Sequence, residues 1–452
     1  MSLRDTLQES TASLNDLQNS AVQLLGQDQQ TIRLREQLHA KLLERLDLNA
    51  IESMAAVQLR AHLKNCIEQI VTEEKLLINE TDLSRLIGDI QNEVIGLGPL
   101  EPLLADPSVS DILVNSYSTV YVERKGRLEK APVHFDNDAH LLKIIEKIVS
   151  RVGRRIDESS PMVDARLQDG SRVNAIIPPL ALDGPALSIR RFSEVPLTMA
   201  NLIEYGSLTD EMALIIAALV KAKTNILVSG GTGSGKTTLL NIMSGFIPDT
   251  ERIITIEDAA ELRLQQPHVV RLETRAPNLE GKGEINQREL LKNTLRMRPD
   301  RIVVGEVRGA EVLDMLQAMN TGHEGSLTTV HANTARDSLT RLENMIGLAG
   351  LKVEQRALRQ QIVSAISVII QSARLSDGKR KITSIQEVTG MEGEMITLQE
   401  IFCFEQTGVA PDGTVLGRFR ATGIRPRFAD RLAARGAPLA DYLFDPDRVR
   451  ER

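Results

Sequence analysis

The sequence contains few cysteines and few aromatic residues. Its 452 residues include two cysteines, no tryptophan and only 3% aromatic residues. Cys66 and Cys403 cannot build a disulfide framework, nor a four-cysteine zinc site within one chain. With so few aromatic side chains, a platform on which nucleic-acid bases stack is not expected. The net charge of −7 also argues against nucleic acid as a partner, although it does not exclude a local basic channel.

Long apolar runs are missing as well. No stretch approaches the roughly 20 apolar residues that a membrane-spanning helix requires. The first residues, MSLRDT, lack the apolar region of a signal peptide. We therefore expect a cytoplasmic protein that reaches a membrane only through a partner. The length and the hydrophobic content of 42% are those of a globular chain with about two to four domains.

The most informative stretch is the glycine-rich segment 230–238, GGTGSGKTT, which matches the motif G-x-x-x-x-G-K-S/T. The apolar run 225–229 before it predicts a buried strand, and 238–245 after it predicts a helix. In this arrangement the backbone N–H groups and the helix N-terminus bind phosphate. Lys236 is expected to contact the β- and γ-phosphates, and Thr237 to hold Mg²⁺. The predicted phosphate-binding residues are Gly230, Thr232, Gly233, Ser234, Gly235, Lys236, Thr237 and Thr238.

Residues 1–80 form the first predicted part of the chain, a helical N-terminal domain. Its start is rich in Gln, Ser and Asn, which is typical of a frayed helix or a disordered tail. Apolar residues then recur at helical spacing. The expected helices cover 31–48, 51–68 and 69–77. No chemistry is visible here, so the domain is either structural or an arm that binds a partner.

Residues 81–192 mix strands with helices, which predicts an α+β sheet domain. The expected strands cover 111–115, 120–124, 162–166, 171–177 and 186–190, and a helix covers 140–152. The first two strands are close enough to form a hairpin. Residues 193–208 contain Pro196 and Gly206 and predict a linker, which is a candidate hinge.

Residues 209–452 alternate helix and strand. This pattern predicts a mostly parallel sheet that is covered on both faces. The expected strands cover 226–229, 252–257, 269–272, 301–304 and 326–331. Helices are expected at 335–348 and 352–370. A C-terminal extension from about 382 to 452 is expected to hold short strands and a basic helical end at 425–435.

A phosphate cradle alone does not hydrolyse ATP, because the reaction also needs an oriented water and charge neutralisation. The first later stretch that can supply these is an apolar strand that ends in three acids, Glu257, Asp258 and Glu261. Strand ends of parallel sheets project side chains into the ligand crevice. One of these acids could accept the proton of the attacking water. A solvated acidic loop is the alternative interpretation.

A second strand, at 301–304, is followed by Gly305 and Glu306. It resembles a Walker B strand, in which the residue before the glutamate is usually Asp. Glu306 is therefore the acid expected near Mg²⁺, acting through bound water. Further on, His323 and His331 bracket a strand, where a neutral histidine could donate a hydrogen bond to phosphate. The alternative is a pair of structural histidines; zinc is not suggested, because no cysteine or third histidine is near.

Together these stretches resemble the four signatures of the secretion ATPase superfamily, the GspE/VirB11-like hexameric motors of type II secretion, type IV pili and type IV secretion. The signatures are Walker A at 230–238, the Asp box at 255–261, a Gly-Glu Walker B at 305–306 and the His box at 322–331. The resemblance covers about 82–371. Finer stretches at 163–166, 170–179 and 188–192, the early helical segment and the end at 425–431 look most like the CpaF branch, which powers tight-adherence (Tad) pili.

The resemblance implies a RecA-like P-loop ATPase domain after a PAS-like sheet domain, with ATP and Mg²⁺ as cofactors. It implies that Thr237 and Glu306 hold the metal, that Glu261 positions or deprotonates water, and that Glu257 supports the metal site. Arginines of the sheet domain are implied to reach nucleotide, some across subunits, with a surface strand charge as the alternative. These arginines are Arg172, Arg190 and Arg191. Arg308 is a further candidate for coupling, and Tyr205 for the adenine site.

The first functional hypothesis is a homohexameric motor at the cytoplasmic face of an inner-membrane pilus platform, which assembles a Tad or type IV-like pilus. The resemblance implies that the same motor also drives retraction. The alternative within the class is a VirB11-type secretion ATPase, against which the long N-terminal and C-terminal segments count. Two cysteines cannot build the tetra-cysteine loop common in type II secretion motors, and the Ala-Ile-Arg helix of retraction motors is missing. A nucleic-acid translocase and a scaffold that binds ATP without turnover are the remaining alternatives.

Overall fold

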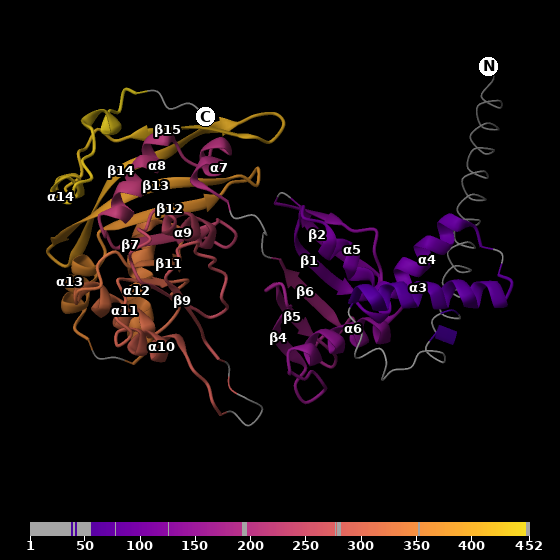
Figure 1. Cartoon of the computed structure of the whole chain (residues 1–452). Helices are drawn as coiled ribbons and strands as arrows, with labels where there is room; N and C mark the ends of the chain where they lie inside the picture. The colour runs from indigo at the N-terminus through magenta and orange to yellow at the C-terminus, as the bar shows by residue number, and fades with distance from the viewer. Residues whose placement is uncertain are drawn as a thin grey trace, which may run out of the picture. The chain divides into compact units, whose positions relative to one another are not determined.

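The computed structural model describes residues 38, 41–42, 56–76, 78–124, 126–191, 197–275, 277, 282–350 and 353–448. The chain divides into two compact units, Met1–Phe192 and Ser193–Arg452, which we call unit 1 and unit 2 (Figure 1). The helix expected over 31–48 lies almost wholly outside the described residues.

Unit 1 begins with a pair of helices. Its helices are α3 (Ala56–Glu73), α4 (Glu80–Val94), α5 (Glu101–Ala105) and α6 (Asp138–Arg151), with a 3-10 turn η1 (Gly98–Leu100). The break expected between 68 and 69 is wrong, because α3 is continuous there. No glycine or proline separates the two patterns, and Ile67 and Ile70 keep the helical spacing. Both are fully buried against Ile90 of α4.

The sheet of unit 1 has six strands in the order β3-β2-β1-β6-β5-β4, and all neighbours are antiparallel. The strands are β1 (Val109–Ser116), β2 (Thr119–Arg124), β3 (Arg127–Lys130), β4 (Met162–Arg166), β5 (Arg172–Ile176) and β6 (Ala186–Arg190). The five expected strands and the hairpin β1–β2 are confirmed. The sequence does not predict β3, whose four residues are all exposed and so show no apolar alternation.

Unit 2 is built on a nine-stranded sheet in the order β15-β14-β13-β12-β7-β11-β10-β8-β9. The six strands from β12 to β9 are parallel, and β13, β14 and β15 extend the sheet as antiparallel neighbours. The parallel strands are β7 (Ile226–Gly230), β8 (Ile253–Glu257), β9 (Val269–Glu273), β10 (Arg301–Val304), β11 (Leu327–His331) and β12 (Val368–Arg374). The antiparallel strands are β13 (Arg380–Glu392), β14 (Met395–Val409) and β15 (Val415–Ala421).

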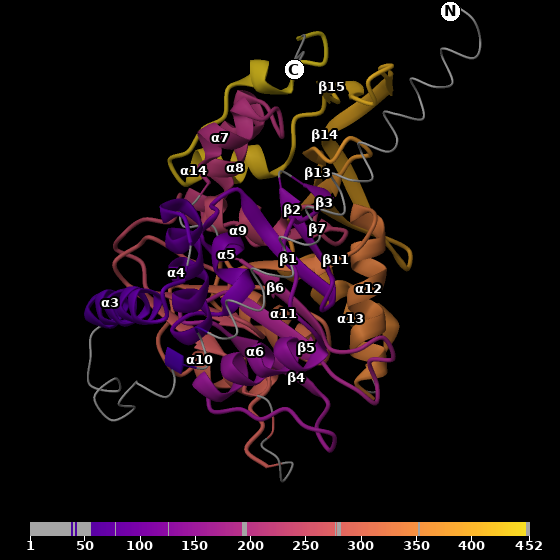
Figure 2. The same ribbon diagram turned by 90° about the vertical axis from the view of Figure 1, so that its right-hand side faces the viewer.

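Helices cover both faces of this sheet, as the alternating pattern predicts. The helices of unit 2 are α7 (Met199–Glu204), α8 (Asp210–Lys221), α9 (Lys236–Ser244), α10 (Gln287–Thr294), α11 (Glu311–Asn320), α12 (Ala335–Leu348), α13 (Gln355–Ala365) and α14 (Phe428–Ala434), with a 3-10 turn η2 (Asp441–Phe444). One apolar core joins α8, α9 and α14 to the sheet, and a second joins α10 to α13 to its other face (Figures 1 and 2). The predicted α/β class with a mostly parallel sheet is confirmed.

The helix expected over 352–370 is too long. Helix α13 ends at Ala365, and the run Val368, Ile369, Ile370 starts strand β12 instead. β-branched residues that are buried on both sides suit a central parallel strand, and β12 pairs with β7. The side chain of Asn225 donates to the backbone oxygen of Ala365, 2.8 Å away, and so holds the end of α13. The strands after 380 are also longer than expected, with 13 residues in β13 and 15 in β14.

Part of the segment expected to be a linker is a helix. Within 193–208 the structure describes 197–208, and α7 occupies half of this described part. Thr198 and Asn201 form a capping box at its start. Leu202 and Ile203 pack against the core of unit 2. The described part of this segment therefore belongs to unit 2.

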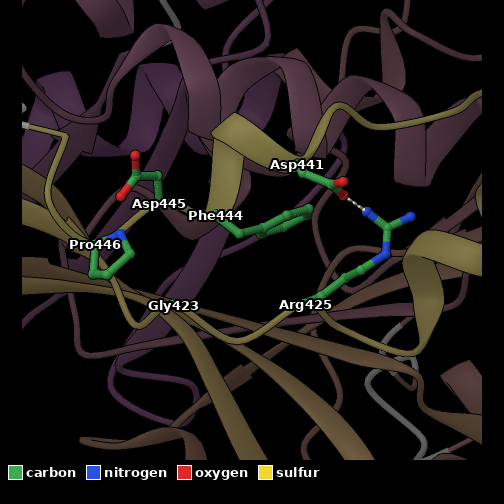
Figure 3. A pocket seen from close by; sticks show the side chains of 6 residues that line it. All are labelled: Gly423, Arg425, Asp441, Phe444, Asp445 and Pro446. Atoms are coloured by element: carbon green, nitrogen blue, oxygen red, sulfur yellow. Dashed lines mark hydrogen bonds and ion pairs between the residues drawn. The ribbon is translucent and has the colours of Figure 1, made fainter.

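The C-terminal segment lines an open pocket of about 300 Å³ just after the end of β15 (Figure 3). Its lining residues are Gly423, Arg425, Asp441, Phe444, Asp445 and Pro446. The guanidinium of Arg425 forms an ion pair with Asp441 across it, and Phe444 is buried in the core of unit 2. These contacts hold the segment after α14 against the sheet.

Candidate nucleotide site

The glycine-rich loop follows β7 at its carboxyl end, where α9 begins. Gly235, before the first residue of α9, has a φ of 90°, a left-handed conformation that favours glycine. A Cβ on Gly230 would lie 2.4 Å from Ser234 Oγ and 2.5 Å from the backbone oxygen of Ser372. No larger residue fits there. These constraints explain why glycine occupies positions 230 and 235. The loop leads directly into the N-terminus of α9, the usual place of a phosphate site.

Lys236 is buried at the base of the loop. Its Nζ donates a hydrogen bond to the backbone oxygen of Gly231, 3.0 Å away. Burial lowers the pKa of Lys236, while the carboxylates of Glu306 and Glu261 act in the opposite direction. The lysine is therefore within electrostatic reach of two of the predicted acids. Of the other loop residues, Thr237 is half-buried and Thr232, Gly233 and Thr238 are exposed.

Glu306 lies beside the loop, because β7, β8, β10 and β11 are parallel and end at the same edge of the sheet. Its Oε2 accepts a hydrogen bond from Arg308 at 3.0 Å, and its Oε1 is 3.6 Å from His331 Nε2. Arg308 also lies 3.8 Å from Asp258. Burial and the charge of Lys236 lower the pKa of His331, which keeps this imidazole neutral. Such a histidine can donate a hydrogen bond without adding charge.

Glu257 is buried at the end of β8, and it holds the Asp box in place. Its Oε2 accepts hydrogen bonds from the backbone N–H groups of Glu261, at 2.7 Å, and Leu262, at 2.9 Å. Burial raises the pKa of the Glu257 carboxyl to about 7, against the opposite effect of these two bonds. Its Oε1 is buried without a protein partner. Glu257 therefore fixes the backbone from which the Glu261 side chain projects.

The glycine of the unusual Walker B strand makes room for Glu257. A Cβ on Gly305 would lie 2.8 Å from Glu257 Cγ and 3.3 Å from its Oε2. The backbone oxygen of Gly305 accepts a hydrogen bond from Thr329, 2.7 Å away, so this position has little freedom to move. The departure from the usual Asp at 305 is thus a packing requirement of the neighbouring strand.

His323 does not lie with the other predicted site residues. It precedes β11, whereas His331 ends that strand and pairs in register with Gly230 of the loop. Four strand steps of about 3.3 Å put the start of β11 roughly 13 Å from its end. His323 is instead next to a turn that Asn225 fixes by accepting from the N–H groups of Gly325 and Ser326. We leave His323 out of the proposed site.

The three predicted arginines lie in unit 1. Arg172 and Arg190 stand directly opposite each other on β5 and β6, and Arg190 forms an ion pair with Asp111 at 3.0 Å. Arg191 donates to the backbone oxygens of Asp106 and Val109, which fixes the entry to β1. Their contact with nucleotide stays a prediction. Tyr205, at the end of α7, is exposed.

Two further arginines lie against the loop, although they belong to none of the motifs in the sequence. Arg380, at the start of β13, donates from Nε to the backbone oxygen of Gly233 at 2.9 Å. The guanidinium of Arg374, at the end of β12, would be 3.6 Å from a Cβ on Gly233. The sequence does indicate the hairpin that carries these two arginines, because the Asp-Gly pair at 377–378 predicts a turn between apolar runs.

The oxygen atoms of this site fit Mg²⁺ bound together with nucleotide. Mg²⁺ prefers oxygen ligands and is usually held by one or two protein groups plus substrate phosphates. Thr237 and Glu306 supply such groups beside Lys236. Among the described residues, no group of three or more His, Cys, Asp and Glu side chains could hold a metal by itself. These side chains are compatible with a metal that arrives with phosphates, and Mg²⁺ at this site stays a prediction.

The fold and the site define a P-loop nucleotide-binding protein, with acids at the ends of neighbouring parallel strands. Residues 93–405 match the family described as type II/IV secretion system protein. This match spans more than half of the chain, and the chain belongs to that family, whose members include secretion ATPases. The predicted superfamily is thus confirmed. None of the described helices has the length and apolar character needed to cross a membrane.

The chain is similar to several proteins of conjugal transfer and type IV secretion. A putative conjugal transfer protein of Mycobacterium tuberculosis is 38% identical over 71% of this chain and 92% of its own length. The type IV secretion system protein VirB11 of Bartonella quintana is 31% identical over 64% of this chain and 91% of its own length. Among solved structures, the VirB11 ATPase of Brucella suis in complex with sulphate is 28% identical, covers 64% of this chain and 92% of its own, and has a TM-score of 0.35.

Proposed function

We propose that this chain is a motor ATPase, which hydrolyses Mg–ATP at the loop 230–238 and uses the reaction to drive a secretion or pilus machine. One observation carries the proposal. Glu306 and the Asp-box acid Glu261 belong to separate segments of the chain, yet the charges of both act on the pKa of Lys236 in the phosphate loop. A phosphate cradle that only binds nucleotide needs no such acids.

The geometry supports a division of labour in the reaction. Lys236 and the loop N–H groups neutralise and orient the β- and γ-phosphates. Thr237 and Glu306 would hold Mg²⁺, whose charge would stabilise the negative charge that develops on the phosphate oxygens. Glu261 orients the attacking water and accepts its proton, and Glu257 keeps Glu261 in place through its backbone N–H.

Two groups beside Glu306 have different tasks. Arg308 pairs with Glu306 at 3.0 Å and so fixes its carboxylate. His331 is neutral and adjoins the same carboxylate. It can donate a hydrogen bond to the γ-phosphate and pass a change of nucleotide to β11.

The proposed working form is a homohexamer that binds an inner-membrane platform protein on its cytoplasmic side. Arg172, Arg190 and Arg191 are the proposed contacts to nucleotide, some of them across a subunit boundary. Kinship with VirB11 and with conjugal transfer proteins supports membership of a membrane-associated machine. Nucleic acid is not proposed as a substrate.

Steady-state release of phosphate from ATP by the full chain tests the activity. Lys236→Ala should abolish tight nucleotide binding, whereas Glu306→Gln should keep binding and reduce turnover by about 10²-fold or more. Glu324→Gln is the matched control, because this exposed glutamate pairs with Arg435 and precedes β11 at the opposite edge. If Lys236→Ala or Glu306→Gln released phosphate from ATP as fast as the Glu324→Gln control, the site assignment would be wrong.

The machine that the motor serves has two candidates. A Tad-type pilus is supported by the resemblance of 163–166, 170–179 and 188–192 to the CpaF branch. The helices α3 and α4 also support it, because they lie almost wholly before the residues that the family model matches. A VirB11-type or conjugal transfer machine is supported by the relatives named above. Replacing Lys236 in the host should abolish pili in the first case, and protein or plasmid transfer in the second.

A further inference from the structure

The hairpin formed by β12 and β13 braces the phosphate loop from the side that does not carry Glu306. Ser372 near the end of β12 places its Oγ 3.0 Å from Ser234 Oγ. Arg380 at the start of β13 donates to the Gly233 backbone oxygen at 2.9 Å, and Arg374 approaches the same residue. Two guanidinium groups and one hydroxyl thus surround a short part of the loop.

The two arginines place two positive charges side by side in the hairpin. Arg374 and Arg380 stand directly opposite each other in the β12–β13 ladder, so their side chains are on the same face of the sheet. Both residues are exposed. Both guanidinium groups lie close to Gly233 of the phosphate loop.

The contact between Arg380 and Gly233 also affects the neighbouring backbone N–H of Ser234. The carbonyl of Gly233 and the N–H of Ser234 belong to one peptide group. That N–H makes only a long contact, 3.4 Å, to the backbone oxygen of Gly231. A cation that is hydrogen-bonded to a peptide oxygen polarises the group and strengthens its N–H as a donor. The Arg380 contact therefore both fixes the loop and makes the Ser234 N–H a better partner for phosphate.

The next two residues of β13 hold a different segment. Lys381 Nζ donates to the backbone oxygen of Gly206 at 2.8 Å, and the Ile382 N–H donates to that of Ser207, also at 2.8 Å. Lys381 is buried, with Nζ 4.9 Å and 5.2 Å from the ring centres of Phe404 and Phe419. Residues 206–207 follow α7, in the segment that enters unit 2. Three consecutive residues of β13 therefore contact both the phosphate loop and this turn.

We propose that Arg380 is a positioning residue for the phosphates of a nucleoside di- or triphosphate, and that residues 380–382 transmit occupancy of the phosphate loop to the turn at 206–207. The inference rests on the proposed function, because its ligand is the nucleotide of that site. Residues 380–382 thereby link phosphate binding to the turn at 206–207, which belongs to the segment that connects unit 1 to unit 2.

Equilibrium binding of a fluorescent ADP to the full chain tests the first part. Arg380→Gln should weaken binding by about three- to tenfold, the effect of losing one hydrogen bond from a charged donor at an exposed position. The turnover number at saturating ATP should fall by less than about twofold, and Arg380→Lys should recover part of the affinity. Lys379→Gln removes one charge from the adjacent position and should change affinity by less than about twofold. Equal affinities for Arg380→Gln and Lys379→Gln would overturn the proposal.

Hydrogen exchange tests the transmission. In the wild-type chain, saturating ADP should slow amide exchange in the peptides that cover 203–208 and 380–384. Lys381→Met keeps the apolar stem but removes the bond to Gly206. This variant should bind ADP with an affinity within about twofold of wild type. ADP should still slow amide exchange at 380–384 in this variant, but no longer at 203–208. A response at 203–208 that is unchanged in Lys381→Met, or absent in the wild type, would refute the transmission.

The same experiments separate this inference from the proposed function. If the wild-type chain neither binds ADP nor hydrolyses ATP, the proposed function fails. If the wild type does both and Arg380→Gln behaves like Lys379→Gln, only the role of Arg380 fails.

Discussion

Replacing Gly305 with alanine tests the packing that links the two acidic signatures. The new Cβ would lie 2.8 Å from Glu257 Cγ, whereas ordinary contacts are 3.4–4 Å. Glu257 must therefore move by about 0.6–1.2 Å. Its bonds to the N–H groups of Glu261 and Leu262, now 2.7 and 2.9 Å, would lengthen beyond useful range. The backbone at 305 is not in a left-handed conformation, so the effect is purely one of space.

The expected magnitude follows from this displacement. Overpacking and two weakened hydrogen bonds should lower the free energy of unfolding by about 1–3 kcal/mol. Displacement of the Asp box by nearly 1 Å should lower the turnover number by roughly 10²-fold, while ADP affinity stays close to wild type because the phosphate loop is not touched. Gly305→Asp, which restores the usual Walker B residue, should be at least as damaging.

Urea unfolding and phosphate release measure the two effects. Gly347→Ala on α12 is the matched control, since a Cβ there meets nothing within 4 Å and the change should be neutral or slightly stabilising. A double-mutant cycle with Glu257→Ala isolates the cause. In that background Gly305→Ala should cost less than about 0.5 kcal/mol. Additive losses, or full activity of Gly305→Ala, would refute the steric explanation.

Two ion-pair clusters give the remaining predictions. Burial lowers the pKa of His140, but hydrogen bonds to Asp136 and Glu93 raise it more, to about 9. Because this exceeds the unfolded value of 6.5, the stabilisation by protonated His140 is complete below pH 6.5 and disappears as the pH rises through about 9. His140→Gln should therefore lower the unfolding free energy by about 1–2 kcal/mol at pH 6, allowing for solvent screening, and by much less at pH 10; an equal loss at both values would contradict the assignment. Glu251→Ala leaves the fully buried Arg301 without its carboxylate and should cost about 3–5 kcal/mol in urea unfolding, and a loss under about 1 kcal/mol would exclude a stabilising pair.

Local patterns predict much of this structure. Helix α12 and strands β4, β6 and β10 begin and end where the sequence places them. The phosphate loop follows from its own residues, and the meeting of Glu306 and His331 follows from the rule that parallel strands end at one edge. These features depend on residues close together in the chain, or on a general rule of topology.

Features that depend on distant residues are not predictable in this way. The run at 368–370 is apolar throughout, and only its place between β7 and β13 makes it a strand. The reason for Gly305 is the side chain of Glu257, on the neighbouring strand. His323 is close to His331 in sequence, yet the length of β11 separates them.

The arginine at 380 illustrates the same limit within the site. Nothing in its neighbourhood indicates phosphate, because its partner Gly233 is 147 residues away. The Asp-Gly pair at 377–378 predicts the turn. It does not predict that the hairpin lies against the phosphate loop.

Single-turnover release of phosphate from ATP is the most direct test of the central claim, that this site hydrolyses ATP. The full chain is mixed with a sub-stoichiometric amount of ATP and Mg²⁺, and phosphate is followed in wild type and in Glu261→Gln. We predict that both bind ATP with similar affinity, that the wild type releases the phosphate, and that Glu261→Gln releases it about 10²-fold or more slowly. Tight binding of ATP by the wild type without release of phosphate would contradict the claim and leave a nucleotide-gated scaffold.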